Sequence, residues 1–362
     1  MGKKVYIILS AIFSIFIITI ISAIVWYNVQ IKGYSNNKVD NQIVVEIKSG
    51  TSTLDIIKVL KENKVIKNEL ATKIYIKLHN VTKLQAGKYE FSGNESLKQV
   101  LSTIQQGKVM DESVTITFKE GKNMRYIASL IAEKTNNNTQ DVYNLINNNE
   151  YISSIKSKYW FITDDVNKDG IYYPLEGYLH PDTYSFANKD VKVKEIFDKM
   201  LDETDKILTK YKSTIELSGC SAHEVLTMAS IVELEGNSAK DRAKIASVIY
   251  NRLKTNMSLG SDVTTYYAVK EDMGKRNLYE KEINTYNPYN TRGPNMAGKL
   301  PIGPICNVSE ESINAVLYPD QNAYLYFVAD KNGDIYFSKT YEEHQERIKT
   351  LQKRGLWYEY NN

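Results

Sequence analysis

The chain has 362 residues, enough for two or three domains, and 42% hydrophobic and 25% charged residues, as in ordinary globular proteins. Its formal net charge is only +3, so we expect no basic surface of the kind that binds nucleic acid. The two cysteines and four histidines lack the spacing of metal ligands, and we predict neither a metal site nor a cofactor.

The first segment with a clear signal is apolar. Residues 5–27, VYIILSAIFSIFIITIISAIVWY, contain no charged side chain and, at 1.5 Å per residue, are long enough to span a bilayer. Lys3 and Lys4 precede the stretch, and Trp26 and Tyr27 close it like interfacial residues. The stretch is longer than the core of a signal peptide and lacks a small-residue cleavage site, so it predicts an uncleaved single-pass anchor.

After the anchor, a short local pattern repeats. We expect residues 1–4 to be a cytoplasmic tip and the polar residues 28–41 to be a linker. A strand-like alternation, a glycine turn and a helix of about three turns then recur in 45–64, in 116–134 and, more weakly, in 87–107.

This pattern resembles the LysM-like modules of cell-wall proteins, although a generic small α+β unit has the same pattern. We therefore predict an α+β protein with LysM-like subdomains over residues 42–135. A connecting segment follows at 136–170. From about residue 171 the sequence motifs become dense, and a second α+β domain is expected over 171–362.

One stretch fits the spacing of a calcium-binding loop. Residues 165–176, DVNKDGIYYPLE, place acidic and amide side chains and a glycine at the required positions. Pro174 would interrupt the exiting helix, however, and the residues before the stretch do not form a good entering helix. Asp, Asn and Gly also form ordinary turns, which is the favoured interpretation.

The segment 221–236, SAHEVLTMASIVELEG, is predicted to be one helix. Ser221 and Glu224 form a capping box, and a glycine stands at the C-terminal end. Glu233 and Glu235 therefore lie in the last turn. At about 100° per residue they point about 200° apart, so at most one faces any given cleft.

The position of these glutamates has a chemical consequence. The C-terminal end of a helix carries partial negative charge, which, together with burial, raises the pKa of a carboxyl group. A glutamate that stays protonated near neutral pH is what a general acid requires. The alternative is that both are solvated residues at a helix end, and spacing alone does not decide.

Seven motifs then make a family recognisable. They occur in this order: LEGYLHPDTYSF (175–186), ASIVELEGN (229–237), ASVIYNRL (246–253), SDVTTYYA (261–268), YNTR (289–292), GKLPIGPICN (298–307) and YLYFVADKNGDIYFSKTYEEH (324–344). Together they resemble the endolytic murein transglycosylases of the MltG (YceG-like) family. The resemblance covers most of the chain after the anchor. It implies a single-pass cell-membrane protein whose C-terminal bulk lies outside the cytoplasm.

The resemblance also implies an activity. Such enzymes cleave the β-1,4 bond between MurNAc and GlcNAc in nascent peptidoglycan strands and leave a 1,6-anhydro-MurNAc end. The sugar's own C6 hydroxyl attacks, so one glutamate can serve as acid and then as base. The family motif implies Glu233 as the catalytic residue, with Glu235 as the second candidate in a supporting role. Wall-synthesis proteins are partners by family analogy alone.

The remaining motifs imply a groove around the acid. The implied substrate-binding residues are Glu176, Tyr178, Asp182, Tyr184, Glu235, Asp262, Thr264, Tyr266, Asn290 and Thr291. HPDTY also fits a structural turn. The sequence departs from the family pattern where Ile302 and Val263 replace prolines, and Ile335 replaces a histidine, which puts a histidine-assisted mechanism in doubt.

Two other functions remain open on sequence grounds. A water-using muramidase could be built on the same scaffold, and it would leave reducing ends instead of anhydro ends. A wall-binding or divisome scaffold without activity is the non-enzymatic alternative, and the presence of Glu233 on a well-capped helix argues against it.

Overall fold

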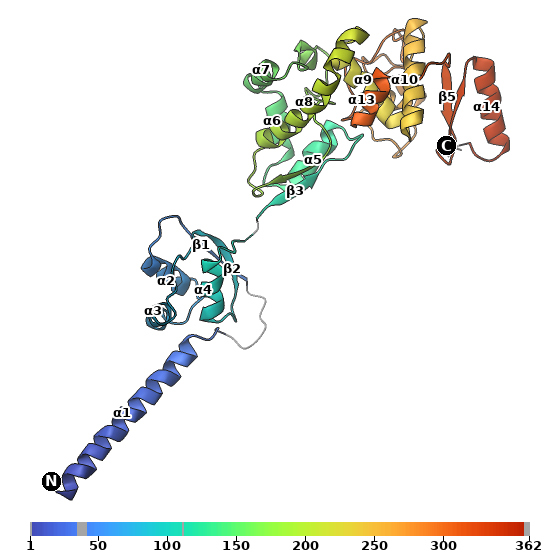
Figure 1. Ribbon diagram of the computed structural model, residues 1–362. Coiled ribbons are helices and arrows are strands. Elements are labelled where there is room, and N and C mark those ends of the chain that lie inside the picture. Colours follow the sequence, from blue (N-terminus) through green and yellow to red (C-terminus); the bar gives the residue numbers. More distant parts are fainter. Residues whose placement is uncertain (1, 35–41, 111, 358–362) are drawn as a thin grey trace. The chain divides into compact units, whose positions relative to one another are not determined.

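The computed structural model describes residues 2–34, 42–110 and 112–357, and the chain forms two compact units, Met1–Glu112 and Ser113–Asn362 (Figure 1). Helices and two-stranded antiparallel sheets make up both units, which confirms the predicted α+β class.

The first unit begins with the apolar helix α1 (Lys3–Gln30). Its hydropathy and length suffice to cross a membrane, and none of its most apolar window is buried by the rest of the protein. The helix therefore fits the predicted single-pass anchor, and it continues three residues beyond the predicted span at 5–27. Residues 35–41 of the predicted linker lie outside the described part of the chain.

A small α+β core follows the anchor. Strand β1 (Gln42–Ile47) pairs antiparallel with β2 (Gly87–Ser92), so that Val45 lies opposite Tyr89. Its three helices are α2 (Thr53–Glu62), α3 (Glu69–Leu78) and α4 (Leu97–Gln105). Alternate strand residues and one stripe of each helix enter the core, as in amphipathic elements generally.

The strand–glycine–helix pattern is confirmed in this unit, because β1 leads into α2 and β2 into α4. Its resemblance to LysM modules stays a prediction. The third copy lies in the second unit: β3 (Val114–Thr117) and α5 (Met124–Lys134) follow Glu112, and β3 pairs with β4 (Thr183–Phe186).

The structure thus divides the chain after Glu112, whereas the sequence predicts a boundary after residue 135. The reason is packing: Ile116, Ile127 and Ile131 are buried in the core of the second unit. A local pattern indicates that a helix has an apolar face, but not which core that face joins.

The second unit is mainly helical. Its N-terminal part contains α6 (Thr139–Ile146), α7 (Asn149–Lys158), the short 3-10 helix η1 (Asp164–Asn167) and the long helix α8 (Val193–Ser218). Residues of the stretch that fits the calcium-loop spacing form a 3-10 turn here, in line with the favoured turn interpretation, and Asp165 pairs with Lys168. Glu176, the last position of that template, is turned into the core instead.

Helix α9 (Ala222–Glu235) lies at the centre of this unit (Figure 1). It contacts α10 (Ala239–Lys254), α11 (Asp262–Ala268) and α13 (Glu310–Leu317). Every residue from Ala222 to Val232 except Glu224 is buried, so the helix is enclosed on all sides. The predicted capping box between Ser221 and Glu224 is confirmed.

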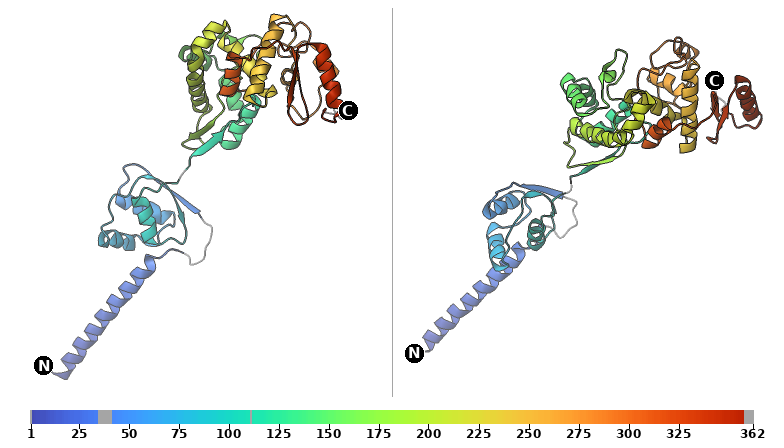
Figure 2. Two further views of the ribbon diagram at one scale, coloured as in Figure 1. Left: turned by 45° about the vertical axis from the view of Figure 1, so that its right-hand side comes forward. Right: turned by 45° about the horizontal axis from the view of Figure 1, so that its top comes forward.

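The C-terminal part is a hairpin with one helix. It consists of β5 (Tyr326–Ala329), β6 (Ile335–Ser338) and α14 (Tyr341–Lys353), and the short helix α12 (Glu280–Ile283) precedes α13. The hairpin contacts α10 (Figure 2). The amide of Asn237, just after α9, donates to the carbonyl of Gly333 in the hairpin turn, 3.0 Å away.

Candidate functional site

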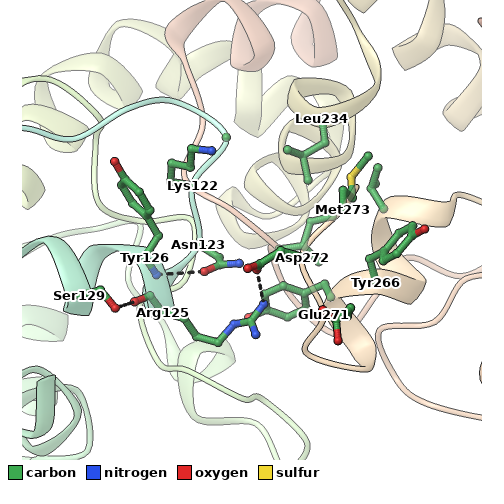
Figure 3. Close-up of a pocket in the computed structure, with 14 residues that line it drawn as sticks. Lys122, Asn123, Arg125, Tyr126, Ser129, Leu234, Tyr266, Glu271, Asp272 and Met273 are labelled. Atoms are coloured by element: carbon green, nitrogen blue, oxygen red, sulfur yellow. Dashed lines mark hydrogen bonds and ion pairs between the residues drawn. The ribbon is translucent and has the colours of Figure 1, made fainter. Parts of the chain in front are cut away.

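A cavity of about 450 Å³ lies within the second unit (Figure 3). One wall comes from the start of α5 and the loop before it, and the other from α11 and the loop after it. Leu234 of α9 and Ile305 also line it. The lining residues are Gly121, Lys122, Asn123, Arg125, Tyr126, Ser129, Leu234, Val263, Tyr266, Tyr267, Glu271, Asp272, Met273 and Ile305.

The first wall depends on a tight turn. Gly121 has φ +69°, a conformation that side chains other than glycine rarely adopt, and its N–H donates to the carbonyl of Asn307. A Cβ at this position would lie 3.3 Å from Leu234, so glycine also permits the close approach to α9. Asn123 then caps α5 by accepting from the N–H of Tyr126.

An ion pair joins the two walls. The Arg125 guanidinium lies 3.0 Å from the Asp272 carboxylate and also donates to the carbonyl of Lys270 (Figure 3). The Lys122 ammonium lies 5.4 Å from the centre of the Tyr126 ring. Aromatic faces beside polar and charged groups are the usual features of sites that hold sugars or other polar ligands.

The residues of this first wall are not among the predicted site residues, because residues 116–134 fall in the predicted LysM-like region. The available signal was a glycine turn followed by the capping residue Asn123, which predicts a helix start. Nothing local indicates that this helix start would meet the end of α9.

Glu233 is enclosed by donors. Its side chain is 4% exposed, and Arg242 contacts one carboxylate oxygen at 3.1 Å. The other oxygen accepts from the Ser309 N–H at 2.9 Å and from the hydroxyls of Ser309 and Ser312. Because Ser309 is the N-cap of α13, Glu233 ties the end of α9 to the start of α13. Both oxygens are engaged within the protein.

Glu235 has a different environment. Among the described residues its carboxyl accepts one hydrogen bond, from the Ser261 hydroxyl at 2.6 Å, and the residue as a whole is partly exposed, as Glu233 is. Burial of the carboxyl raises its pKa, the Ser261 hydrogen bond lowers it, and the charge of Asp262 raises it again. Ser261 stands at the N-cap of α11 without capping it, so its hydroxyl is committed to Glu235.

Leu234 lies between the two glutamates and faces the cavity. Helix geometry turns its neighbours about 100° to either side, Glu233 toward α13 and Glu235 toward α11. Neither carboxyl is part of the cavity lining among the described residues. Glu235 is joined through Ser261 to the start of α11, whose Val263 and Tyr266 line the cavity, and Glu233 lies beside Gly121, another lining residue.

Glu176 is a third buried carboxyl group. It is 2% exposed, and both oxygens lie 3.0 Å from the Met124 N–H at the start of α5, while the Tyr267 hydroxyl donates to one of them. Burial raises its pKa from 4.5 to about 7 despite these hydrogen bonds. Its contacts connect the two walls behind the cavity.

The raised pKa of Glu176 predicts a pH dependence of stability. The folded state binds this proton more tightly than the unfolded state, so the contribution of Glu176 to stability is fully present below pH 4.5 and is lost as the pH rises through about 7. The loss is roughly 3 kcal/mol for a shift of this size. Glu176→Gln should remove this part of the slope in thermal unfolding at pH 5 and pH 8. An unchanged slope would contradict it.

Most of the other predicted binding residues are parts of the fold. Thr264 and Thr291 are buried and join their hydroxyls at 2.8 Å. Buried Asn290 donates to three backbone carbonyls, those of Glu282, Ile283 and Thr285. These contacts hold the loop after α12 against α11.

The remaining predicted binding residues differ from one another in burial and in their contacts. Tyr178 is buried with its hydroxyl 2.7 Å from His223, and Tyr184 donates to the carbonyl of His180. Asp182 is exposed beside β4, and Asp262 pairs with Arg292. Of the ten predicted binding residues, Tyr266 lines the cavity. In the described ranges, no cluster of three or more metal-ligating side chains is found.

Comparisons with known proteins agree with one another. The chain matches the model of the YceG-like family over residues 45–350. It is 36% identical over 303 residues to the endolytic murein transglycosylase of Bacillus subtilis (strain 168). This match covers 83% of this chain and 82% of that protein. The corresponding protein of Streptococcus pneumoniae serotype 2 is 30% identical over 322 residues, 84% of this chain and 58% of that protein.

A solved structure is similar as well. The crystal structure of a YceG-like protein from Listeria monocytogenes is 38% identical in sequence and superimposes with a TM-score of 0.61. The match covers 85% of this chain and 100% of that one. Both the fold and the sequence therefore point to the same group of proteins.

Proposed function

The chain belongs to the YceG-like family, and on this premise we propose that it is an endolytic murein transglycosylase with Glu235 as its general acid. Its substrate is then the glycan strand of peptidoglycan. The observation that carries the assignment of the acid is the contrast between two carboxyl groups two residues apart.

Glu235 has the properties that a general acid needs. Its pKa is raised, its carboxyl accepts one hydrogen bond among the described residues, from Ser261, and Ser261 begins the helix whose Val263 and Tyr266 line the cavity. Glu233 has both oxygens engaged by Arg242, Ser309 and Ser312 and is therefore better suited to hold α13. We accordingly exchange the roles that the family motif suggests: Glu235 is the proposed acid and Glu233 a structural residue.

The proposed reaction needs this one carboxyl group. Protonated Glu235 donates its proton to the glycosidic oxygen while the bond from that oxygen to C1 of MurNAc breaks. The C6 hydroxyl of the same sugar then bonds to C1, and its proton returns to the Glu235 carboxylate. Atoms balance without water, the acid is regenerated, and the product carries a 1,6-anhydro-MurNAc end.

The cavity supplies groups that suit a glycan strand. The rings of Tyr126 and Tyr266 offer faces for sugar rings, and Lys122 and Arg125 offer donors to hydroxyl, acetyl and carboxylate oxygens. We propose that the strand lies in this cavity and that its scissile bond reaches the edge beside Glu235.

The cellular setting follows from the substrate. Helix α1 fits a single-pass anchor, and murein lies outside the cytoplasmic membrane, so the C-terminal bulk is proposed to be extracytoplasmic. Cleavage of nascent strands near the membrane, in contact with wall-synthesis proteins, is the role proposed by family analogy.

Analysis of the products tests the reaction. The full chain in detergent, incubated with purified uncrosslinked glycan strands, should release fragments with anhydro-MurNAc ends, measured by mass spectrometry. Anhydro ends are one water, about 18 Da, lighter than hydrolytic ends because no water is consumed. Reducing MurNAc ends would indicate a water-using muramidase, and absence of any cleavage would favour a wall-binding scaffold.

A further inference from the structure

The first unit exposes an apolar stripe on α3. Leu70, Ile74 and Leu78 are 59%, 36% and 66% exposed. They are four residues apart, so they follow one another along one side of the helix with an offset of about 40° each. An adjoining side of α3 packs into the unit, since Ala71, Thr72 and Tyr75 are buried there. Three large aliphatic side chains in a row on one exposed face are unusual for a surface that meets only water.

This stripe lies beside the end of the membrane anchor. Tyr27 of α1 and Ile31, the C-cap of this helix, pack against the core of the first unit. Tyr75 of α3 is close enough to Tyr27 to interact with it electrostatically. Figure 1 and Figure 2 both show α3 on the side of the unit where α1 ends.

The connection between anchor and unit is tight. The carbonyl of Ile31 accepts from the N–H of Leu97, and the N–H of Tyr34 donates to the carbonyl of Gly93. Gly33 passes so close to the carbonyl of Asn94 that a Cβ would collide with it. The first contacts with the unit therefore come about one helical turn after Tyr27, the residue expected at the membrane interface. When α1 spans a bilayer, the side of the unit that contacts α1 lies at the level of the lipid headgroups.

The charges around the stripe are complementary to a lipid surface. Lys77 and Lys73 lie next to the stripe, about 20° and 60° from Leu70 around the helix, and Lys73 pairs with Glu69 at 3.8 Å. Lys67 precedes α3 and lies over the Tyr34 ring at 6.0 Å. Long cationic side chains beside an apolar stripe can reach phosphate groups while the stripe enters the acyl boundary.

We propose that α3 lies in the membrane interface, with Leu70, Ile74 and Leu78 inserted among the lipids and the neighbouring lysines at anionic headgroups. The bilayer that holds α1 is the occupant of this face, because the same compact unit contains both elements. The first unit is then a membrane-bound base with a fixed orientation, held at two points.

Spin labels in vesicles test this proposal. The full chain would carry Cys220→Ser, and the other free cysteine, Cys306, is 1% exposed, so burial shields it from the label. Labels are placed at Leu70→Cys and Leu78→Cys, both on exposed positions where substitution leaves the core intact. The control is Lys48→Cys in the turn between β1 and α2, which lies on the side away from α1 (Figure 1).

In vesicles of phosphatidylethanolamine and phosphatidylglycerol, the ratio of oxygen to nickel-complex collisions should be several-fold higher at positions 70 and 78 than at 48. Equal ratios at all three positions would overturn the proposal. Spin–spin broadening at 70 and 78 that disappears on dilution with unlabelled protein would also overturn it, because a second copy would then cover the stripe.

Discussion

Glu235→Gln is expected to reduce the rate of glycan cleavage by about 100- to 10,000-fold, the usual contribution of a general acid. The amide keeps the size of the side chain and can still accept from the Ser261 hydroxyl, so the end of α9 stays in place. It carries no acidic proton for the leaving oxygen. The rate is measured as release of soluble fragments from purified glycan strands by the full chain.

Two further variants make this result interpretable. Glu346→Gln changes the same chemical group on the exposed face of α14 and should cleave at the wild-type rate. Glu233→Gln tests the assignment taken from the family motif. If Glu235→Gln cleaves normally while Glu233→Gln is folded and inactive, the roles proposed for the two glutamates must be reversed.

The neighbours of Glu235 should shift the pH profile in opposite directions. Cleavage needs the protonated acid, so kcat/KM falls as the pH rises through the raised pKa of Glu235. Ser261→Ala removes a hydrogen bond that lowers this pKa and should move the falling limb to higher pH. Asp262→Asn removes a charge that raises it and should move the limb to lower pH. Shifts of the same sign would contradict the assignment.

The sequence predicted the local structure around the site well. The capping box of α9, its end near Gly236 and the apolar N-terminal helix are all signals carried by neighbouring residues, and the structure confirms them. The family resemblance likewise rests on short motifs, which the comparisons bear out.

The contacts between distant segments could not be predicted in the same way. Glu233 and Glu235 have equivalent positions at a helix end, and they differ because Ser309 lies 76 residues from one and Ser261 lies 26 residues from the other. Likewise, Asn290 and Thr291 belong to a motif yet hold a loop, and Arg125 and Asp272 meet across 147 positions. Which faces meet depends on the tertiary packing.

Glu233→Ala should lower the free energy of unfolding of the second unit by about 3–5 kcal/mol, because it breaks a buried ion pair and leaves three donors of α13 without their acceptor. For a unit of this size, the midpoint of thermal unfolding should fall by roughly 10 °C. Glu311→Ala is the matched control: it removes the other partner of Arg242, but that carboxylate is 65% exposed, and the expected cost is about 1 kcal/mol or less. If calorimetry showed the same loss of stability for both variants, buried Glu233 would stabilise the unit no more than exposed Glu311 does. The structural role of Glu233 would then have to be abandoned.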